Sequence, residues 1–73
     1  MRVKVANRVY AMSRREFEGI LNTASEQVPF GVYAIEKNGY AELMNVKVKS
    51  ITKLKEVSRA YKSQGYRVYA NRG

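Results

Sequence analysis

Apolar and polar residues alternate with a period of two along residues 2–12, RVKVANRVYAM. This period predicts a β-strand with one buried face, because successive side chains of a strand point to opposite faces. The apolar parity carries Val3, Val5, Val9 and Ala11. Asn7 falls on the same parity, where burying its amide would be costly. Either a β-bulge near Ala6 and Asn7 or an end of strand pairing there would remove the conflict.

The next segment has the period of an amphipathic helix. A capping box marks its start, since Ser13 and Glu16 can each satisfy a free backbone N–H group. Pro29 ends it, because the residue before a proline is disfavoured in the α region. The predicted buried stripe is Phe17, Ile20, Leu21, Ala24 and Val28.

A second helix is predicted near residue 50. Either Ser50 or Thr52 caps its start, and Gly65 supplies a C′ residue at its end. Its predicted stripe is Ile51, Leu54, Val57, Ser58 and Tyr61. Its solvent face is mostly basic, with Lys53, Lys55, Glu56, Arg59 and Lys62.

Two further strands are predicted within residues 30–49, on either side of Asn38 and Gly39, and a last strand at residues 66–71. An Asn-Gly pair between alternating apolar runs is a strong hairpin signal, because both residues accept a positive φ. A two-residue turn would pair Lys37 with Tyr40, and a three-residue loop would pair Glu36 with Tyr40.

The two registers bury different residues. The two-residue turn puts Tyr33 and Ile35 in the core, whereas the three-residue loop puts Phe30, Val32 and Ala34 there. We favour the three-residue loop, because it buries more apolar area and spares the Tyr33 phenol from needing a buried partner.

The order of elements is β-α-β-β-α-β, in a single domain covering residues 1–73. With right-handed crossovers this order predicts an α+β fold, the ferredoxin-like sandwich. Its four-stranded antiparallel sheet has the strand order 4-1-3-2, with both helices on one face and the other face open. The tetrapeptide Arg-Val-Tyr-Ala occurs at residues 8–11 and again at 67–70, in strands predicted to be antiparallel neighbours.

Charge adds a preference for polyanions to this picture. The 73 residues carry 14 Lys and Arg against six acidic residues, all of them Glu, for a formal net charge of +8. Eight of the basic residues lie from Met44 onward, against Glu56 alone. Such an asymmetric excess favours nucleic acid, or an acidic protein surface, as the partner.

Missing residue types remove most catalytic chemistry. Without Cys or His there is no thiol nucleophile, no imidazole base and no nitrogen or sulfur metal ligand. The five glycines are scattered and form no phosphate-binding loop. We therefore expect no enzymatic activity, no cofactor and no metal. With no signal peptide and no long apolar run, we expect a cytoplasmic protein that does not bind membranes.

The open sheet face is the predicted functional site. Basic groups neutralise phosphates, and tyrosine rings between them can stack on bases. The expected partner is therefore single-stranded RNA or DNA. The candidate residues are Arg2, Lys4, Arg8, Tyr10, Tyr33, Asn45, Lys47, Lys49, Arg67 and Tyr69.

The alternative is a protein–protein interaction module that uses the same face. Ile35, Leu43 and the tyrosines would form its apolar centre, and the basic residues its rim. The partner would be a second copy in a homodimer, or an acidic protein. A viral or mobile-element factor that binds and inhibits a host protein would have the same features.

Overall fold

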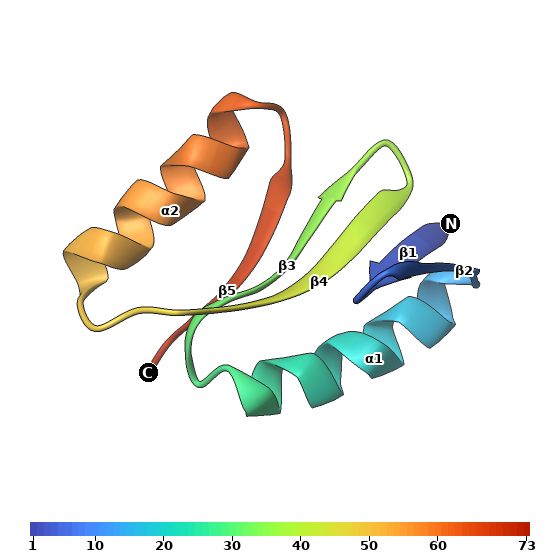
Figure 1. The fold of residues 1–73 in the computed structure, drawn as a ribbon, viewed down its shortest axis with the longest axis horizontal. Coiled ribbons are helices and arrows are strands. Elements are labelled where there is room, and N and C mark those ends of the chain that lie inside the picture. The colour runs from blue at the N-terminus through green and yellow to red at the C-terminus, as the bar shows by residue number, and fades with distance from the viewer.

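A five-stranded mixed sheet lies between two helices (Figure 1). The structure is a computed structural model that describes residues 1–73. Its elements are β1 (Arg2–Val5), β2 (Arg8–Ala11), α1 (Arg14–Gln27), β3 (Phe30–Lys37), β4 (Tyr40–Lys47), α2 (Ile51–Ser63) and β5 (Arg67–Arg72).

The first predicted strand is in fact two strands. The chain reverses at Ala6 and Asn7, so that Val5 pairs with Arg8 in an antiparallel β1–β2 hairpin. Of the two alternatives for Asn7, the end of strand pairing is therefore the correct one. Both turn residues are exposed, which leaves the Asn7 amide in solvent. Ala6 has a φ of +56°, an unusual value for a residue with a Cβ atom.

The strand order is β2-β1-β4-β3-β5. The α+β class is confirmed, but the four-stranded antiparallel ferredoxin-like sheet with order 4-1-3-2 is wrong. β1 does lie beside β4, but the two strands are parallel. The outer edge of β1 is occupied by β2, so β5 pairs with β3 instead. The two Arg-Val-Tyr-Ala copies therefore lie at opposite edges of the sheet.

The helices pack on opposite faces of the sheet, not on one face as predicted (Figure 1). On the α1 side, Phe17 packs with Val3 and Ala41. On the α2 side, Leu54 packs with Val32 and Ile35. No sheet face is left open across its whole width, which removes the premise of the predicted binding site.

Both helix starts follow the sequence signals. The Ser13–Glu16 capping box is present, and Ser50 rather than Thr52 caps α2 by accepting from the Lys53 backbone N–H. After α2, Gly65 has a φ of +90° and donates to the Lys62 carbonyl, while the Tyr66 N–H donates to the Tyr61 carbonyl. These two bonds form a Schellman motif, which turns the chain into β5.

The β3–β4 hairpin has a two-residue turn, so the favoured three-residue loop is wrong. Lys37 pairs with Tyr40, and Asn38 and Gly39 both have positive φ values. The register then shifts between Val32 and Ala34.

This irregularity explains why the register of the two-residue turn holds only from Ala34 to Lys37. The irregularity lets Val32 and Ile35 both face α2, although three positions separate them, so each register captured one half of the strand.

Candidate nucleic-acid interface

The predicted binding residues do not share one surface. Pairing and packing place seven of them on the α1 side: Arg8, Tyr10, Tyr33, Asn45, Lys47, Arg67 and Tyr69. Arg2 and Lys4 lie on the α2 side, beside Tyr40 and Glu42. Lys49 follows β4 in a connecting loop. The structure therefore divides the set between two faces, and α1 covers part of the larger group.

Two of the three candidate tyrosines are occupied by packing. Tyr69 makes an edge-on contact with the Phe17 ring, with 6.0 Å between the two centroids. The centroid of the Tyr33 ring lies 6.3 Å from that of Tyr69. Tyr10 is 46% exposed and remains accessible. Tyr69 is also packed against the α1-side cluster, so a base could reach its ring only by displacing neighbouring side chains.

A hydrogen-bonded network on the α1 side joins three elements. Arg14 of α1 donates to both carboxylate oxygens of Glu36 in β3, and its Nη1 lies 2.9 Å from Oε1. The Tyr69 hydroxyl of β5 donates to the same oxygen at 2.8 Å. Arg67 stacks over the Tyr69 ring, 5.1 Å from its centroid.

These contacts shift the ionisation of the three groups. The hydrogen bond from Arg14 is the main cause that holds the pKa of Glu36 below its ordinary value. The same hydrogen bond raises the pKa of Arg14. Burial, followed by the Glu36 hydrogen bond, raises the pKa of Tyr69. A carboxylate that is paired and fully ionised is suited to tying α1 to the sheet and not to accepting protons from a substrate.

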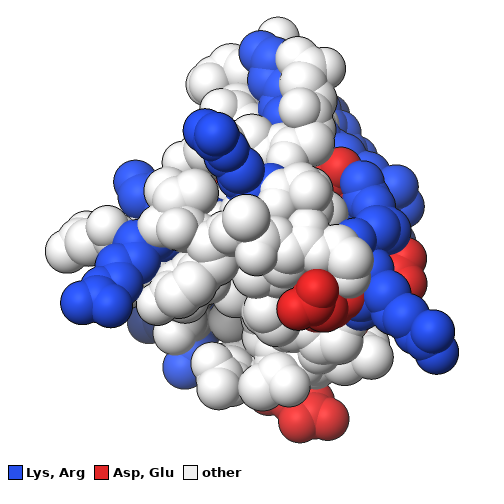
Figure 2. Space-filling model, turned by 90° about the vertical axis from the view of Figure 1, so that its right-hand side faces the viewer, with Lys and Arg blue, Asp and Glu red and all other residues white.

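Acidic and basic residues are unevenly distributed along the chain. Three of the six acidic residues belong to α1: Glu16, Glu18 and Glu26. Residues 44–73, which include α2 and β5, carry eight basic residues and one acidic one. Figure 2 shows another side of the molecule, where basic side chains project from several separate places around an uncharged centre, with acidic ones beside some of them.

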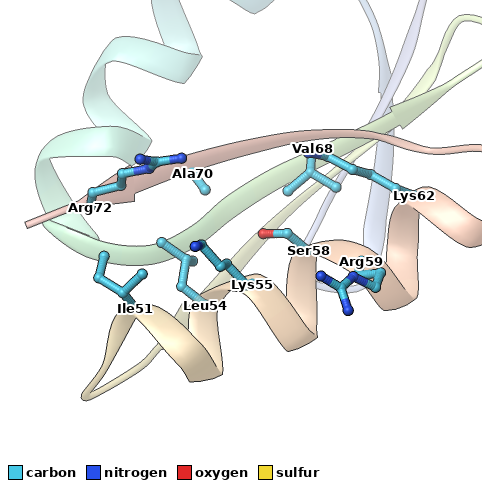
Figure 3. A pocket seen from close by; sticks show the side chains of 9 residues that line it. All are labelled: Ile51, Leu54, Lys55, Ser58, Arg59, Lys62, Val68, Ala70 and Arg72. Carbon is cyan, nitrogen blue, oxygen red and sulfur yellow. The ribbon is translucent and has the colours of Figure 1, made fainter.

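A recess of about 340 Å³ lies between α2 and the edge strand β5 (Figure 3). We call it the cationic groove. Four of its lining residues are basic: Lys55, Arg59, Lys62 and Arg72. Four are apolar, and a serine completes the lining: Ile51, Leu54, Val68, Ala70 and Ser58. No acidic residue lines it.

The basic side chains of the groove are free to meet an anion. None of the four takes part in an ion pair or in a side-chain hydrogen bond. By contrast, Lys53 on the same helix lies 3.6 Å from Glu56. Because none of these four cations is paired with a carboxylate, their positive charge is available to an anion from solvent.

Local sequence places three of these cations and the fold supplies the fourth. Lys55, Arg59 and Lys62 recur at i, i+4 and i+7, so they lie along one flank of α2. The sequence predicted all three on the mostly basic solvent face of this helix. Arg72 was missed, because only the pairing of β5 with β3 brings it beside α2.

A second recess, of about 560 Å³, lies on the α1 side against β1 and β4. Val5, Ile20 and Leu43 contribute apolar surface, and Glu16 is its only charged residue. It therefore offers nothing that would attract a polyanion.

The remaining site chemistry is limited. No three of the Asp, Glu, His or Cys side chains lie together as a group that could hold a metal ion. Neither helix has the length and apolarity needed to cross a membrane. The cationic groove can bind anionic groups through Lys and Arg, and its apolar floor can contact carbon-rich surface.

Comparisons with protein-family models, with curated proteins and with solved structures found no match for this chain.

Proposed function

We propose that this protein binds nucleic acid, chiefly through contacts between phosphates and the cationic groove. One observation carries the proposal: four unpaired basic side chains line a recess that contains no acidic residue. Phosphate contacts of this kind supply most of the affinity of proteins that bind without sequence preference.

The charge distribution supports a polyanion over a single small anion. Residues 44–73 hold seven of the eight net positive charges, so the field extends well beyond the groove. Lys49 lies in the loop just before α2 and is exposed. An extended chain of phosphates would gain from the groove and from this nearby cation together.

This proposal relocates the interface that the sequence predicted. Binding on the sheet face would need Tyr33 and Tyr69, which are already packed. Binding at the groove needs neither ring. We therefore expect little sequence preference, because phosphate contacts carry no base information. This role requires no catalysis and no cofactor.

Fluorescence anisotropy with labelled DNA and RNA oligonucleotides, measured across a salt series, tests the proposal. The logarithm of the affinity should fall linearly with the logarithm of salt concentration. Lys55→Ala should weaken binding to all sequences about equally and reduce the salt slope by about 1. Lys53→Ala, which removes an ion-paired lysine outside the groove, is the matched control and should change the slope less.

The proposal fails if the wild-type chain shows no salt-dependent affinity near micromolar concentration. It also fails if Lys53→Ala and Lys55→Ala have equal effects, since the groove would then have no special role. Circular dichroism of both variants checks that α2 stays folded.

A second candidate function is a protein contact at the β1–β2 hairpin. Three exposed large apolar side chains lie on this hairpin and on the adjoining end of β4. Val9 and Tyr40, which are 50% and 41% exposed, face the α2 side, and Tyr10, which is 46% exposed, faces the α1 side. β2 also presents an unpaired sheet edge, which can accept a strand from another chain. Sedimentation velocity tests whether that chain is a second copy: a dimer that Val9→Lys dissociates would support it, and a monomer at all concentrations would exclude a homodimer.

A further inference from the structure

The cationic groove has an apolar floor as well as basic rims. In Figure 3 Leu54, Ser58, Val68 and Ala70 lie between the helix and the strand, with Ile51 and Arg72 at one end and Arg59 and Lys62 at the other. Ile51 is 40% exposed, although it is a large aliphatic residue. Phosphate binding alone gives no role to this exposed apolar surface.

A duplex could use only part of this arrangement. Its outer surface presents phosphates and sugars, while its bases are stacked inside. Phosphates of a duplex could meet the rims, but they would lose water against an apolar floor without gaining a hydrogen bond there. A helix that reads a DNA duplex enters the major groove of the DNA. The basic residues of the cationic groove lie instead on the flank of α2 that faces β5.

A single strand could use the whole groove. Its unstacked bases and sugars expose flat, carbon-rich faces that can cover aliphatic side chains, while its phosphates reach the rims. The floor has no aromatic ring, so its contacts should tolerate any base. Covering Ile51 would also remove apolar area from water, which is favourable.

We propose that the cationic groove is a single-strand site, in which bases or sugars cover Ile51 and its neighbours while phosphates bind the rims. This inference depends on the proposed function, because it assumes that the groove binds nucleic acid. It adds a preference for single-stranded over double-stranded ligands and assigns that preference to one side chain.

The test compares three probes: a labelled DNA strand of about 16 nucleotides, the RNA of the same sequence, and the DNA duplex. The wild-type chain should bind both single strands at least about fivefold more tightly than the duplex at equal salt. Ile51→Ser should weaken single-strand binding by about threefold to tenfold and leave duplex binding unchanged. Serine is well tolerated at a helix start, so α2 should remain folded.

Val9→Ser is the matched control, because Val9 is a similarly exposed aliphatic residue on the far edge strand. It should change binding to none of the three probes. Equal or tighter binding to the duplex would overturn the single-strand inference, and so would an equal loss for all probes in Ile51→Ser. In either case, a reduced salt slope in Lys55→Ala would still support phosphate binding at the groove. A chain that binds no probe would overturn both proposals.

Discussion

The tetrapeptide Arg-Val-Tyr-Ala occurs in both edge strands of the sheet, β2 and β5, but the two copies differ strongly in burial. All four residues of the β2 copy are exposed, including Val9 at 50% and Tyr10 at 46%. In the β5 copy only the arginine is exposed. Val68 packs in the α2-side cluster, and Tyr69 bonds to Glu36 on the other face.

The difference arises from what covers each strand. β5 lies within reach of both helices, because α2 packs on one of its faces and Phe17 of α1 on the other. β2 pairs with β1 alone and packs in neither buried cluster. Identical local sequence therefore gives a packed edge and a bare edge, since burial is set by neighbours that are distant in the chain.

The same contrast bears on function. In both copies the arginine and the tyrosine point to the α1 side. The two copies themselves are about 19 Å apart, because four strand spacings separate β2 from β5. They cannot form one compact stacking surface, and α1 covers part of the sheet between them. What β5 contributes instead is Arg72 and the apolar floor of the cationic groove.

The largest expected effect is a loss of stability at Gly31, on the packed side of the sheet. Gly31 has a φ of +151°, and an added Cβ would lie 2.0 Å from the Val46 carbonyl oxygen. Gly31→Ala should therefore lower the free energy of unfolding by about 3 kcal/mol or more, as measured by urea denaturation. Gly19→Ala is the control: nothing lies within 4 Å, so it should raise stability by about 0.5–1 kcal/mol.

The next largest effect separates the two copies directly. Tyr69→Ala should cost about 2–3 kcal/mol of unfolding free energy, because it removes a ring packed on Phe17 and the hydrogen bond to Glu36. Tyr10→Ala should cost less than about 1 kcal/mol, because the ring is half in solvent. Equal losses in urea denaturation would mean that a partner covers β2 in solution.

A smaller effect is expected at the turns that lead into the two edge strands. Ala6, before β2, has a φ of +56°, whereas the turn before β5 uses Gly65 at +90°. Ala6→Gly should raise the melting temperature, with a gain of about 0.5–1 kcal/mol from relieved strain. Gly65→Ala should lower the free energy of unfolding by about 1 kcal/mol, because alanine is strained at a positive φ. A loss in Ala6→Gly would show that the β1–β2 turn is not strained.

The smallest expected effect is a change in the pH dependence of stability. It tests the hydrogen-bonded network of Arg14, Glu36 and Tyr69 that holds β5. Hydrogen bonding from Arg14 lowers the pKa of Glu36 in the folded chain. The ionised Glu36 carboxylate therefore contributes its full stabilisation above the unfolded-state pKa of about 4.3. This stabilisation is lost as the pH falls through the lower pKa of the folded state. Wild type should exceed Glu36→Gln in stability near pH 6, and the difference should shrink steadily toward about pH 3. A constant difference across this range would contradict the pairing.

Local signals predicted the helices well. The capping box at Ser13 and Glu16 and the stop at Gly65 each involve only residues near one another in the chain, although the local signals left Ser50 and Thr52 open as caps of α2. Such contacts form wherever the segment lies, so they can be recognised without the fold.

Two features of the sheet could not be recognised in this way. Ala6 is a poor residue for a turn at positive φ, so the alternating pattern concealed the β1–β2 hairpin, and only Asn7 suggested an interruption. The irregularity near Tyr33 changes which side chains face each helix. Neither register assumed it, because each took a strict period of two along the whole strand.

The sequence by itself determined the number of helices, the place of the hairpin at Asn38 and Gly39, and the concentration of positive charge after Met44. Tertiary structure decided that the helices lie on opposite faces, that β5 pairs with β3, and that Arg72 joins the α2 cations around one groove. The physical reason is range. Caps, turns and charges are properties of a few adjacent residues, whereas strand partners and covered faces depend on which distant apolar surfaces can be buried together.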